Sequence, residues 1–519
     1  MHIGQSVIAA LESVGQPLVI DAQQMKQRRV QIVDVHSILD DIEREGVRFT
    51  VDRAWSDSAT GHPNGKASSM VVTPVIGVSQ FSLAIGCPAK LATPHNERVF
   101  EQASLPQVAD YLCSIPAGMT RQVWLRLASR QLDEGTYTAE VKVSAPATFL
   151  WSADVPLSVH VYPVRLPDHL SAFVGGWDYP FADTYQVTEN NLADYVMTLR
   201  EYGINTTWAA NPFPLGTFDG KGNLVTPPSR TVAGQWLQRW PDARLYCAVL
   251  FELLPLDAPQ RHEKYKAWAQ DWSQYLQGRG VAPDQVAFLI RDEPTSEAEL
   301  AVILETGRAI QEGEPRFKIW NDLHFPDLNR APANTDTVMR ETCDIQCFNV
   351  QHYLAQPAAY QAFMEKYRRP GLMWWTYTGG GSHRLTDPYV AWQLRFWFCH
   401  DQQLRGAHFW AFGDGNGGFG WNEYLNAGPS HSPFYLSADT VVPSKSLEAM
   451  REGAQDYELL QMLHAHLLRA NDAPALRQLQ RDVQHVLSAH RLALWSWHEA
   501  KDRSTADQVR KKVLRQLSD

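Results

Sequence analysis

Short stretches that alternate apolar and polar residues dominate the first part of the chain. Residues 135–144 alternate strictly, and residues 155–162 repeat the pattern. Such alternation is typical of a strand with one buried and one solvated face. Shorter runs of this kind, at residues 48–51 and 122–127, are separated by polar, Gly-rich or Pro-rich joints. Many short strands with few helical stretches predict a β-sandwich over residues 1–165.

From about residue 170 the pattern changes, and apolar runs alternate with stretches of helical periodicity. We expect strands at residues 172–175, 206–210, 245–251, 287–290, 317–320, 345–350, 372–377 and 407–411. We expect helices at residues 190–202, 232–239, 262–276, 297–311, 335–343, 357–367 and 388–404, with a closing helix at 444–463. Alternating strands and helices form a parallel sheet, and eight such units match the number and size of a (β/α)8 TIM barrel. The barrel is predicted over residues 166–465. A dinucleotide-binding fold is not expected, because no glycine fingerprint follows the first strand.

Residues 466–519 keep the helical period but carry many charges. Helices of this type bury one stripe and leave the other in solvent. We therefore expect a C-terminal helical extension on the outside of the barrel and assign it no chemistry. A chain of 519 residues exceeds what one core can organise. The fold class predicted is multidomain α/β and β, made of a β-sandwich, a barrel and this extension.

Composition narrows the range of partners. The net charge is −10, and no cluster of Lys and Arg is present, so nucleic acid is not expected to bind. No apolar run approaches the length of a membrane span, and no signal peptide is visible at the start. The sequence as written is expected to be cytoplasmic, or periplasmic or secreted if a leader is missing. The oligomeric state is left open. The six cysteines are scattered, which argues against a disulfide framework.

The apolar run at residues 286–290 ends in two adjacent carboxylates, Asp292 and Glu293, followed by Pro294. A capping box at residues 296–299 then begins a helix. A buried strand that ends in acids before a helix is where a barrel keeps its catalytic groups. Adjacent residues of a regular strand point to opposite faces, so both acids reach one site only if the strand breaks there. Pro294 supplies a reason for that break.

The other strand ends carry mostly aromatic and hydrogen-bonding side chains. Rings of Trp and Tyr cover the C–H faces of sugars, while Asp and Asn bind the hydroxyls. A carbohydrate substrate is therefore predicted, such as an oligosaccharide or a glycoconjugate. The residues expected to bind it are Trp177, Asp178, Asn211, Asp322, His324, His352, Trp375, Tyr377, Trp410, Asp414, Trp421 and Glu423.

A metal centre is the competing interpretation of this rim. His324, His352 and His383 lie near successive strand ends. None of these three histidines belongs to an H-x-H or H-E-x-x-H sequence, and no histidine flanks the acidic pair. We expect no metal and no cofactor.

Two motifs carry a family resemblance. The sequence R-D-E-P at residues 291–294 follows an apolar strand, and PSKSLEAMREGAQDYELL occupies residues 443–460. The first resembles the catalytic motif of glycoside hydrolase family 123 and its domain-of-unknown-function relatives. The second is similar to the closing helix of that family, R-x-E-A-x-R-x-G-x-x-D-Y-E-x-L, although Lys445 and Ser446 depart from it. The order of a sandwich and a barrel agrees as well.

The resemblance implies a retaining, exo-acting β-N-acetylhexosaminidase of the galactosaminidase type, in which the 2-acetamido group of the substrate is the nucleophile. It implies that Glu293 is the general acid/base and that Asp292 orients and stabilises the acetamide. Two neighbouring carboxylates in a partly dry site should separate their pKa values, which fits such a division of roles.

Two alternatives remain open from the residues alone. A glycosidase of a non-acetamido sugar would pair Glu293 with a second carboxylate, and Asp322, Asp414 and Glu423 are the candidates. The seventh strand ends without a carboxylate, in Tyr-Thr-Gly-Gly-Gly, which argues against the common two-carboxylate arrangement. The other alternative is a non-catalytic carbohydrate-binding protein.

Overall fold

The computed structural model describes the later two thirds of the chain almost continuously and the first third mainly through its strands. The described residues are 7–12, 20–21, 48–52, 68–75, 81–86, 99–102, 111–115, 122–127, 132–144, 152–177, 187–250, 253–379, 387–413, 432–436, 441–490 and 502–518.

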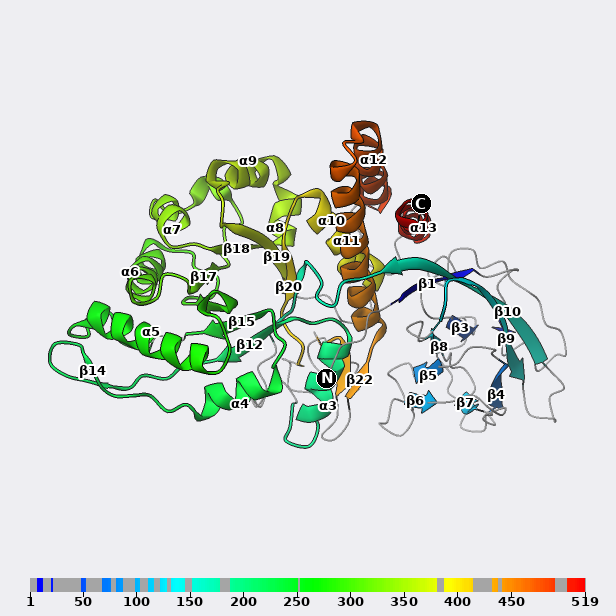
Figure 1. The fold of residues 1–519 in the computed structure, drawn as a ribbon, viewed down its shortest axis with the longest axis horizontal. Helices are drawn as coiled ribbons and strands as arrows, with labels where there is room; N and C mark the ends of the chain where they lie inside the picture. Colours follow the sequence, from blue (N-terminus) through cyan, green and yellow to red (C-terminus); the bar gives the residue numbers. More distant parts are fainter. Residues whose placement is uncertain are drawn as a thin grey trace, which may run out of the picture.

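A sheet of eight parallel strands forms the core of the part of the chain from residue 173 to residue 409, on the other side of the C-terminal helices from the N-terminal strands (Figure 1). Its strands are β11 (Phe173–Val174), β12 (Thr206–Ala210), β15 (Leu245–Val249), β16 (Val286–Leu289), β17 (Lys318–Asn321), β18 (Ile345–Asn349), β19 (Met373–Thr378) and β20 (Gly406–Phe409). From β12 to β20 each strand of this sheet pairs with the one that follows it, and β20 pairs with β11. A parallel bridge between Gly175 and Thr206 joins the remaining edges. The eight expected strands are thereby confirmed, and the nearly closed parallel barrel that they form is consistent with the predicted TIM barrel.

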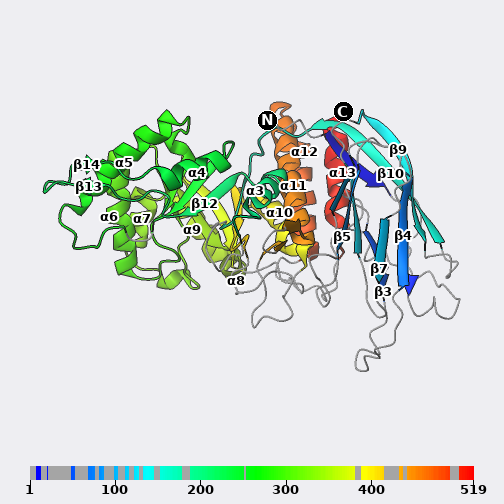
Figure 2. The ribbon, with the colours of Figure 1, turned by 90° about the horizontal axis from the view of Figure 1, so that it is seen from below.

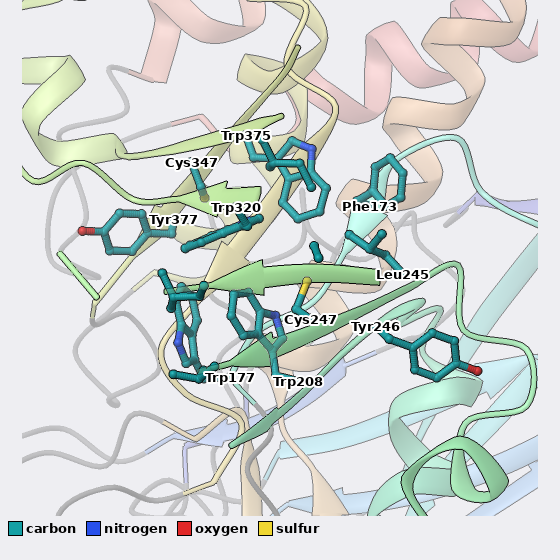
Figure 3. Close-up of a cluster of buried hydrophobic side chains, with 14 of the residues drawn as sticks. Phe173, Trp177, Trp208, Leu245, Tyr246, Cys247, Trp320, Cys347, Trp375 and Tyr377 are labelled. Atoms are coloured by element: carbon teal, nitrogen blue, oxygen red, sulfur yellow. The ribbon is translucent and has the colours of Figure 1, made fainter. Parts of the chain in front are cut away.

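Glycines allow the barrel to hold large rings. The barrel interior carries tryptophans such as Trp208, Trp320 and Trp375, all fully buried (Figure 3). A Cβ atom added to Gly406 would lie 2.6 Å from the ring of Trp375, and one added to Gly175 would lie 2.6 Å from a backbone oxygen of Thr206. Real Cβ atoms do not approach so closely, so these positions accept only glycine without a local shift.

Helices cover the outside of the sheet (Figure 1). They are α3 (Leu192–Glu201), α4 (Thr231–Arg239), α5 (Arg261–Gly278), α6 (Glu297–Gly313), α7 (Thr335–Glu341), α8 (Val350–Ala355), α9 (Pro357–Tyr367), the π-helical η8 (Tyr389–Gln393) and α10 (Leu394–Asp401). Short 3-10 turns, η6 (Pro283–Gln285) and η7 (Leu328–Arg330), and the two-stranded sheets β13–β14 (Thr217–Phe218, Leu224–Thr226) and β21–β22 (Phe434–Leu436, Val441–Pro443) complete this region. The predicted capping box is present, since Glu299 N–H donates to the Ser296 hydroxyl and Ser296 N–H donates to the Glu299 carboxylate.

Several helical features differ from the expectation. The closing helix expected at residues 444–463 continues as far as Arg469. The sixth strand ends one residue earlier than predicted, because Asn349 caps the short helix α8 by accepting a hydrogen bond from the Gln351 N–H at 2.9 Å. The single helix expected at residues 388–404 is divided into η8 and α10, because five residues there adopt π-helical bonding before the α-helix starts.

The N-terminal strands form two five-stranded sheets. The first has the order β1-β10-β9-β4-β7 (Val7–Glu12, Ser152–Arg165, Gly135–Ser144, Ser68–Val75, Tyr111–Ile115). The second has the order β2-β3-β8-β5-β6 (Ile20–Asp21, Arg48–Asp52, Gln122–Leu127, Phe81–Gly86, Val99–Gln102). The alternation seen in the sequence corresponds to β9 and β10, which pair antiparallel. Packing of the two sheets as a β-sandwich stays a prediction.

Three C-terminal helices stand between the barrel and these sheets (Figure 2). They are α11 (Lys445–Arg469), α12 (Ala473–His490) and α13 (Thr505–Ser518). Their apolar faces share a core with α10 and with the end of β10, where Tyr162 and Val164 lie. Arg503 forms a buried ion pair with Asp387 at 2.7 Å, which ties the segment before α13 to the barrel. The domain boundaries at 165 and 465 stay predictions.

In the part of the chain that the structure describes, no helix is both long enough and apolar enough to cross a membrane.

Candidate active site

The acidic pair follows β16 at the C-terminal edge of the barrel. The strand ends at Leu289, and the backbone bends through residues 291–293. Glu293 has a φ of 44°, in the left-handed region that residues with a side chain rarely adopt. The strand therefore breaks before both acids, as expected from the sequence. A left-handed conformation is retained where neighbouring groups hold it, and it is common at functional sites.

Asp322 holds this bend from the neighbouring strand. It directly follows β17, and its Oδ1 accepts the Glu293 N–H at 3.0 Å. The Asp322 side chain is fully buried and is also a hydrogen-bond partner of the Asp292 carboxyl. Burial raises the pKa of Asp322 well above its ordinary value, and the nearby charge of Asp292 raises it further. Two carboxyl groups that interact directly tend to share a proton, because neighbouring like charges destabilise each other.

Asp292 lies between this buried acid and the surface. Burial of its carboxyl raises its pKa, the hydrogen bond with Asp322 opposes that rise, and the charge of Glu293 adds to it. Part of the residue remains exposed. Of Asp292 and Asp322, Asp292 is thus the one that a substrate can reach.

The Glu293 side chain contacts groups from two other strands. Tyr377, near the end of β19, donates its hydroxyl hydrogen to Glu293 Oε1. His324 Nδ1, beyond β17, lies 3.3 Å from the same oxygen and 3.3 Å from the Tyr377 hydroxyl. The Glu293 side chain is 42% exposed and that of His324 25%. The carboxyl group is therefore fixed on one side and open to solvent on the other, as a general acid/base requires.

Tyr377 and His352 are held neutral by their surroundings. Burial raises the pKa of Tyr377 far above its ordinary value, and the charges of Asp322 and Glu293 add to this, so the phenol keeps its proton. Burial lowers the pKa of His352, whose ring meets that of His324 edge-on at 4.4 Å between centroids. His352 lies on α8 rather than at a strand end.

The aromatic floor of the site belongs to the barrel core (Figure 3). Trp177 stacks on Trp208 at 4.6 Å between centroids and approaches Tyr377 at 6.0 Å. Only 3% of Trp177 is exposed, so neither ring face is open to a sugar. The expectation that Trp177 binds substrate directly is therefore corrected, and the ring instead supports Tyr377 from below.

Trp375 requires the same correction. It is fully buried, stacked against Phe173 at 4.9 Å and close to His408 at 4.6 Å. Trp375 and Tyr377 point to the same face of β19, but Trp375 lies two residues, roughly 6.6 Å, deeper along the strand. Asp322 is corrected as well, because its complete burial leaves it no surface for contact with substrate.

Two of the remaining residues predicted to bind substrate, Asn211 and Trp410, lie in the described part of the chain. Asn211 is exposed at the end of β12, with a φ of 45°, and Trp410 is partly buried after β20. Their contact with substrate stays a prediction. Asp178, Asp414, Trp421 and Glu423 lie outside the described residues, as does His383.

Sequence reasoning missed one polar residue of the site. Asn349, at the end of β18, lies near enough to the Tyr377 hydroxyl to lower its pKa and also caps α8. An asparagine that directly follows an apolar strand is a helix-cap signal, and that signal could have identified it. Among the described residues, no group of three or more His, Cys, Asp or Glu side chains could hold a metal ion.

Comparison with known proteins bears on the fold. No protein-family model and no curated protein sequence matches the chain. Among solved structures, a family 123 glycoside hydrolase from Clostridium perfringens, reported in a study of glycolipid glycan hydrolysis, has a TM-score of 0.59. The match covers 98% of this chain and 97% of that chain at 12% identity. The chain thus shares its fold with that enzyme over nearly its whole length, and the fold agrees with the resemblance seen in the motifs.

Other glycosidase structures match less closely. An endo-β-1,4-mannanase from Thermotoga petrophila has a TM-score of 0.38 at 13% identity, covering 55% of this chain and 77% of that chain. A family 39 β-xylosidase from Caulobacter crescentus has a TM-score of 0.37 at 14% identity, covering 57% of this chain and 72% of that chain. These scores are too low to support an argument about this chain.

Proposed function

We propose that the chain is a glycoside hydrolase and that Glu293 is its general acid/base. The observation that carries this proposal is the placement of Glu293 at the C-terminal edge of a closed parallel barrel, where such enzymes keep their catalytic groups. Its carboxyl group is fixed by Tyr377 and His324 and is open to solvent. The likeness in fold to the family 123 glycoside hydrolase supports the same assignment.

The substrate we propose is a β-linked 2-acetamido sugar, cleaved from a chain end with retention of configuration. In this mechanism the acetamide oxygen attacks the anomeric carbon while Glu293 protonates the departing oxygen. An oxazolinium forms, and water activated by Glu293 then opens it. Asp292 would stabilise the positive charge that develops on the acetamide nitrogen. The hydrogen bond between Asp292 and Asp322, a buried acid, supports this role because it orients the Asp292 carboxyl beside Glu293.

An alternative enzyme uses Glu293 with a second carboxylate on a sugar without an acetamide. Asp322 is a poor candidate for that carboxylate, because it is fully buried and its Oδ1 accepts the Glu293 N–H. Asp414 and Glu423 are the other candidates, so a conventional two-carboxylate mechanism would depend on them. A non-catalytic carbohydrate-binding protein is the third candidate, although it would have no need for a general acid fixed as Glu293 is.

The experiment that tests the proposal is a screen of chromogenic glycosides that differ only in sugar and anomer. Hydrolysis of β-linked 2-acetamido sugars, lost in Glu293→Gln, is the expected result. A thiazoline analogue of the oxazolinium should then bind much more tightly than the parent sugar, as mimics of intermediates do. Hydrolysis of 2-hydroxy sugars alone, with a glycosyl-enzyme trapped on Asp414 or Glu423 by a 2-fluoro sugar, would establish the alternative. If no glycoside is hydrolysed, the non-catalytic carbohydrate-binding protein is the candidate that remains.

A further inference from the structure

Asp322 makes contacts that neither a substrate ligand nor a nucleophile would need. Its Oδ1 accepts the backbone N–H of Glu293 at 3.0 Å, and its carboxyl is hydrogen-bonded to that of Asp292. Among the described residues, no N–H or O–H group donates to its Oδ2, although that atom is buried. A buried carboxylate oxygen without a donor is costly, whereas a carboxylic acid O–H that donates to a neighbouring carboxylate removes the cost.

We propose that Asp322 is a positioning residue that keeps a proton and donates it to Asp292, so that Asp292 remains an ionised acceptor facing the substrate. The same side chain holds Glu293 in its left-handed conformation through the backbone hydrogen bond. Asp322 would touch neither the sugar nor the reacting atoms. The inference rests on the proposed function for its catalytic meaning, but the position of the proton can be measured without turnover.

Burial decides which acid of the pair carries the proton. Asp322 is completely buried, whereas Asp292 keeps an exposed surface that can solvate a charge. The charged form is disfavoured most where water is excluded. The titratable groups that act on Asp322 come from three elements and are Asp292 and Glu293 after β16, Cys347 on β18 and Tyr377 on β19. These groups are acids or neutral donors, so a second negative charge at Asp322 would be repelled rather than stabilised.

The arrangement suits the proposed chemistry. If both acids were charged, their repulsion would drive the Asp292 carboxyl away from Asp322. If Asp292 held the proton, it could not stabilise a positive charge on the acetamide nitrogen. A proton on Asp322 solves both problems, because it neutralises the inner acid and gives the outer acid a fixed hydrogen-bond donor. Asp292 then acts as an oriented anion, as preorganised electrostatic stabilisation requires.

Asparagine at position 322 tests the idea, because it imitates a protonated aspartic acid. Its amide oxygen can accept the Glu293 N–H, and its amide N–H can donate to Asp292. Asp322→Asn should keep kcat within about tenfold of the native enzyme, the effect of one imperfect hydrogen bond. Asp322→Ala removes both contacts and should lower kcat about a hundredfold, the cost of misplacing a catalytic group. Asp344→Asn, which alters a carboxyl just before β18 at the other end of the barrel, is the matched control and should leave activity unchanged.

The proton itself is read by infrared difference spectroscopy near neutral pH. The Glu293→Gln variant removes the other acid of the site, and its spectrum is compared with that of Glu293→Gln/Asp322→Asn. The C=O band of a protonated carboxylic acid should be present in the first protein and absent from the second. Folding of every variant is checked by circular dichroism.

Two results would overturn the proposal. One is an infrared band that is missing from the Glu293→Gln protein or persists after Asp322→Asn. The other is a folded Asp322→Asn protein as inactive as Asp322→Ala, since this would mean that Asp322 acts as an anion. If the native protein hydrolyses no glycoside, the proposed function fails, yet the infrared comparison still tests whether the site holds a protonated acid that depends on Asp322.

Discussion

The hydroxyl of Tyr377 donates a hydrogen bond to Glu293 Oε1, joining β19 to the bend after β16 across the C-terminal edge of the barrel. Because burial keeps the Tyr377 phenol protonated, this donor is available over the whole working range of pH. His324 lies within 3.3 Å of both groups. Glu293 is therefore positioned by groups from two other strands, β17 and β19, and this positioning leads to the first prediction.

Replacing Tyr377 with Phe removes the donor and keeps the ring that packs on Trp177. We expect kcat/KM to fall about tenfold to a hundredfold, the loss typical of a hydrogen bond to a charged group, with little change in thermal stability. Tyr360→Phe is the control, because its hydroxyl bonds to the Phe325 carbonyl on the outside of the barrel at 3.0 Å. Equal losses of activity in the two variants would show that Tyr377 has no special relation to Glu293.

Replacing Glu293 with Gln removes the proposed proton donor while keeping the size of the side chain. Turnover of substrates with poor leaving groups should be abolished, whereas substrates with good leaving groups should be affected less, because they depart without acid assistance. The measurement is kcat/KM across a series of aryl glycosides with graded leaving groups. Glu305→Gln, at an exposed position of α6, is the control. A uniform loss across the series would remove Glu293 from the acid role.

Replacing Trp375 with Ala tests its reassignment from the rim to the core. Since the ring is fully buried against Phe173 and His408, the change should lower the free energy of unfolding by about 3–5 kcal/mol, as in other large-to-small core changes. Trp375→Phe should lose less stability and keep KM. Chemical denaturation and steady-state kinetics provide the measurements. A Trp375→Ala protein with native stability but weakened sugar binding would show that Trp375 binds substrate and is not a core residue.

Much of this architecture could be predicted from the sequence. The apolar runs gave all eight barrel strands, and the Ser296–Glu299 capping box and the bend before Pro294 were both visible as local patterns. Depth inside the barrel was not visible. Trp375 and Tyr377 share a face of β19, and only closure of the barrel decides that the first lies in the core and the second at the rim. The pairing of Asp322 with Asp292 depends in the same way on the alignment of β16 with β17.

The buried acid pair also predicts a pH dependence of stability. The pKa of Asp322 is raised above its ordinary 3.8, so the folded protein keeps a proton that the unfolded chain releases. The free energy of unfolding therefore falls as pH rises from about 3.8 through the folded pKa. Asp322→Asn has no proton to lose, so its melting temperature relative to the native protein should rise across that interval.

Asp336→Asn serves as the control, because its stability relative to the native protein should change with pH in the opposite direction to that of Asp322→Asn. Hydrogen bonds from Lys366, Arg340 and Tyr367 lower the pKa of Asp336 to about 2. Its stabilising contribution is present above its ordinary 3.8 and is lost as pH falls toward 2, so the deficit of Asp336→Asn should shrink at low pH. Differences of the same sign in both variants would contradict the assignment of the proton to Asp322.

The central claim is that the acetamide of the substrate is the nucleophile and that Asp292 and Glu293 act on it. The most direct test is to compare kcat/KM for two aryl β-glycosides that differ only in carrying a 2-acetamido or a 2-hydroxyl group, using native enzyme and Asp292→Asn. The account predicts that native enzyme hydrolyses the acetamido sugar and leaves the hydroxy sugar nearly intact, and that Asp292→Asn loses turnover while it still binds the acetamido sugar. Faster hydrolysis of the hydroxy sugar, insensitive to Asp292→Asn, would contradict it.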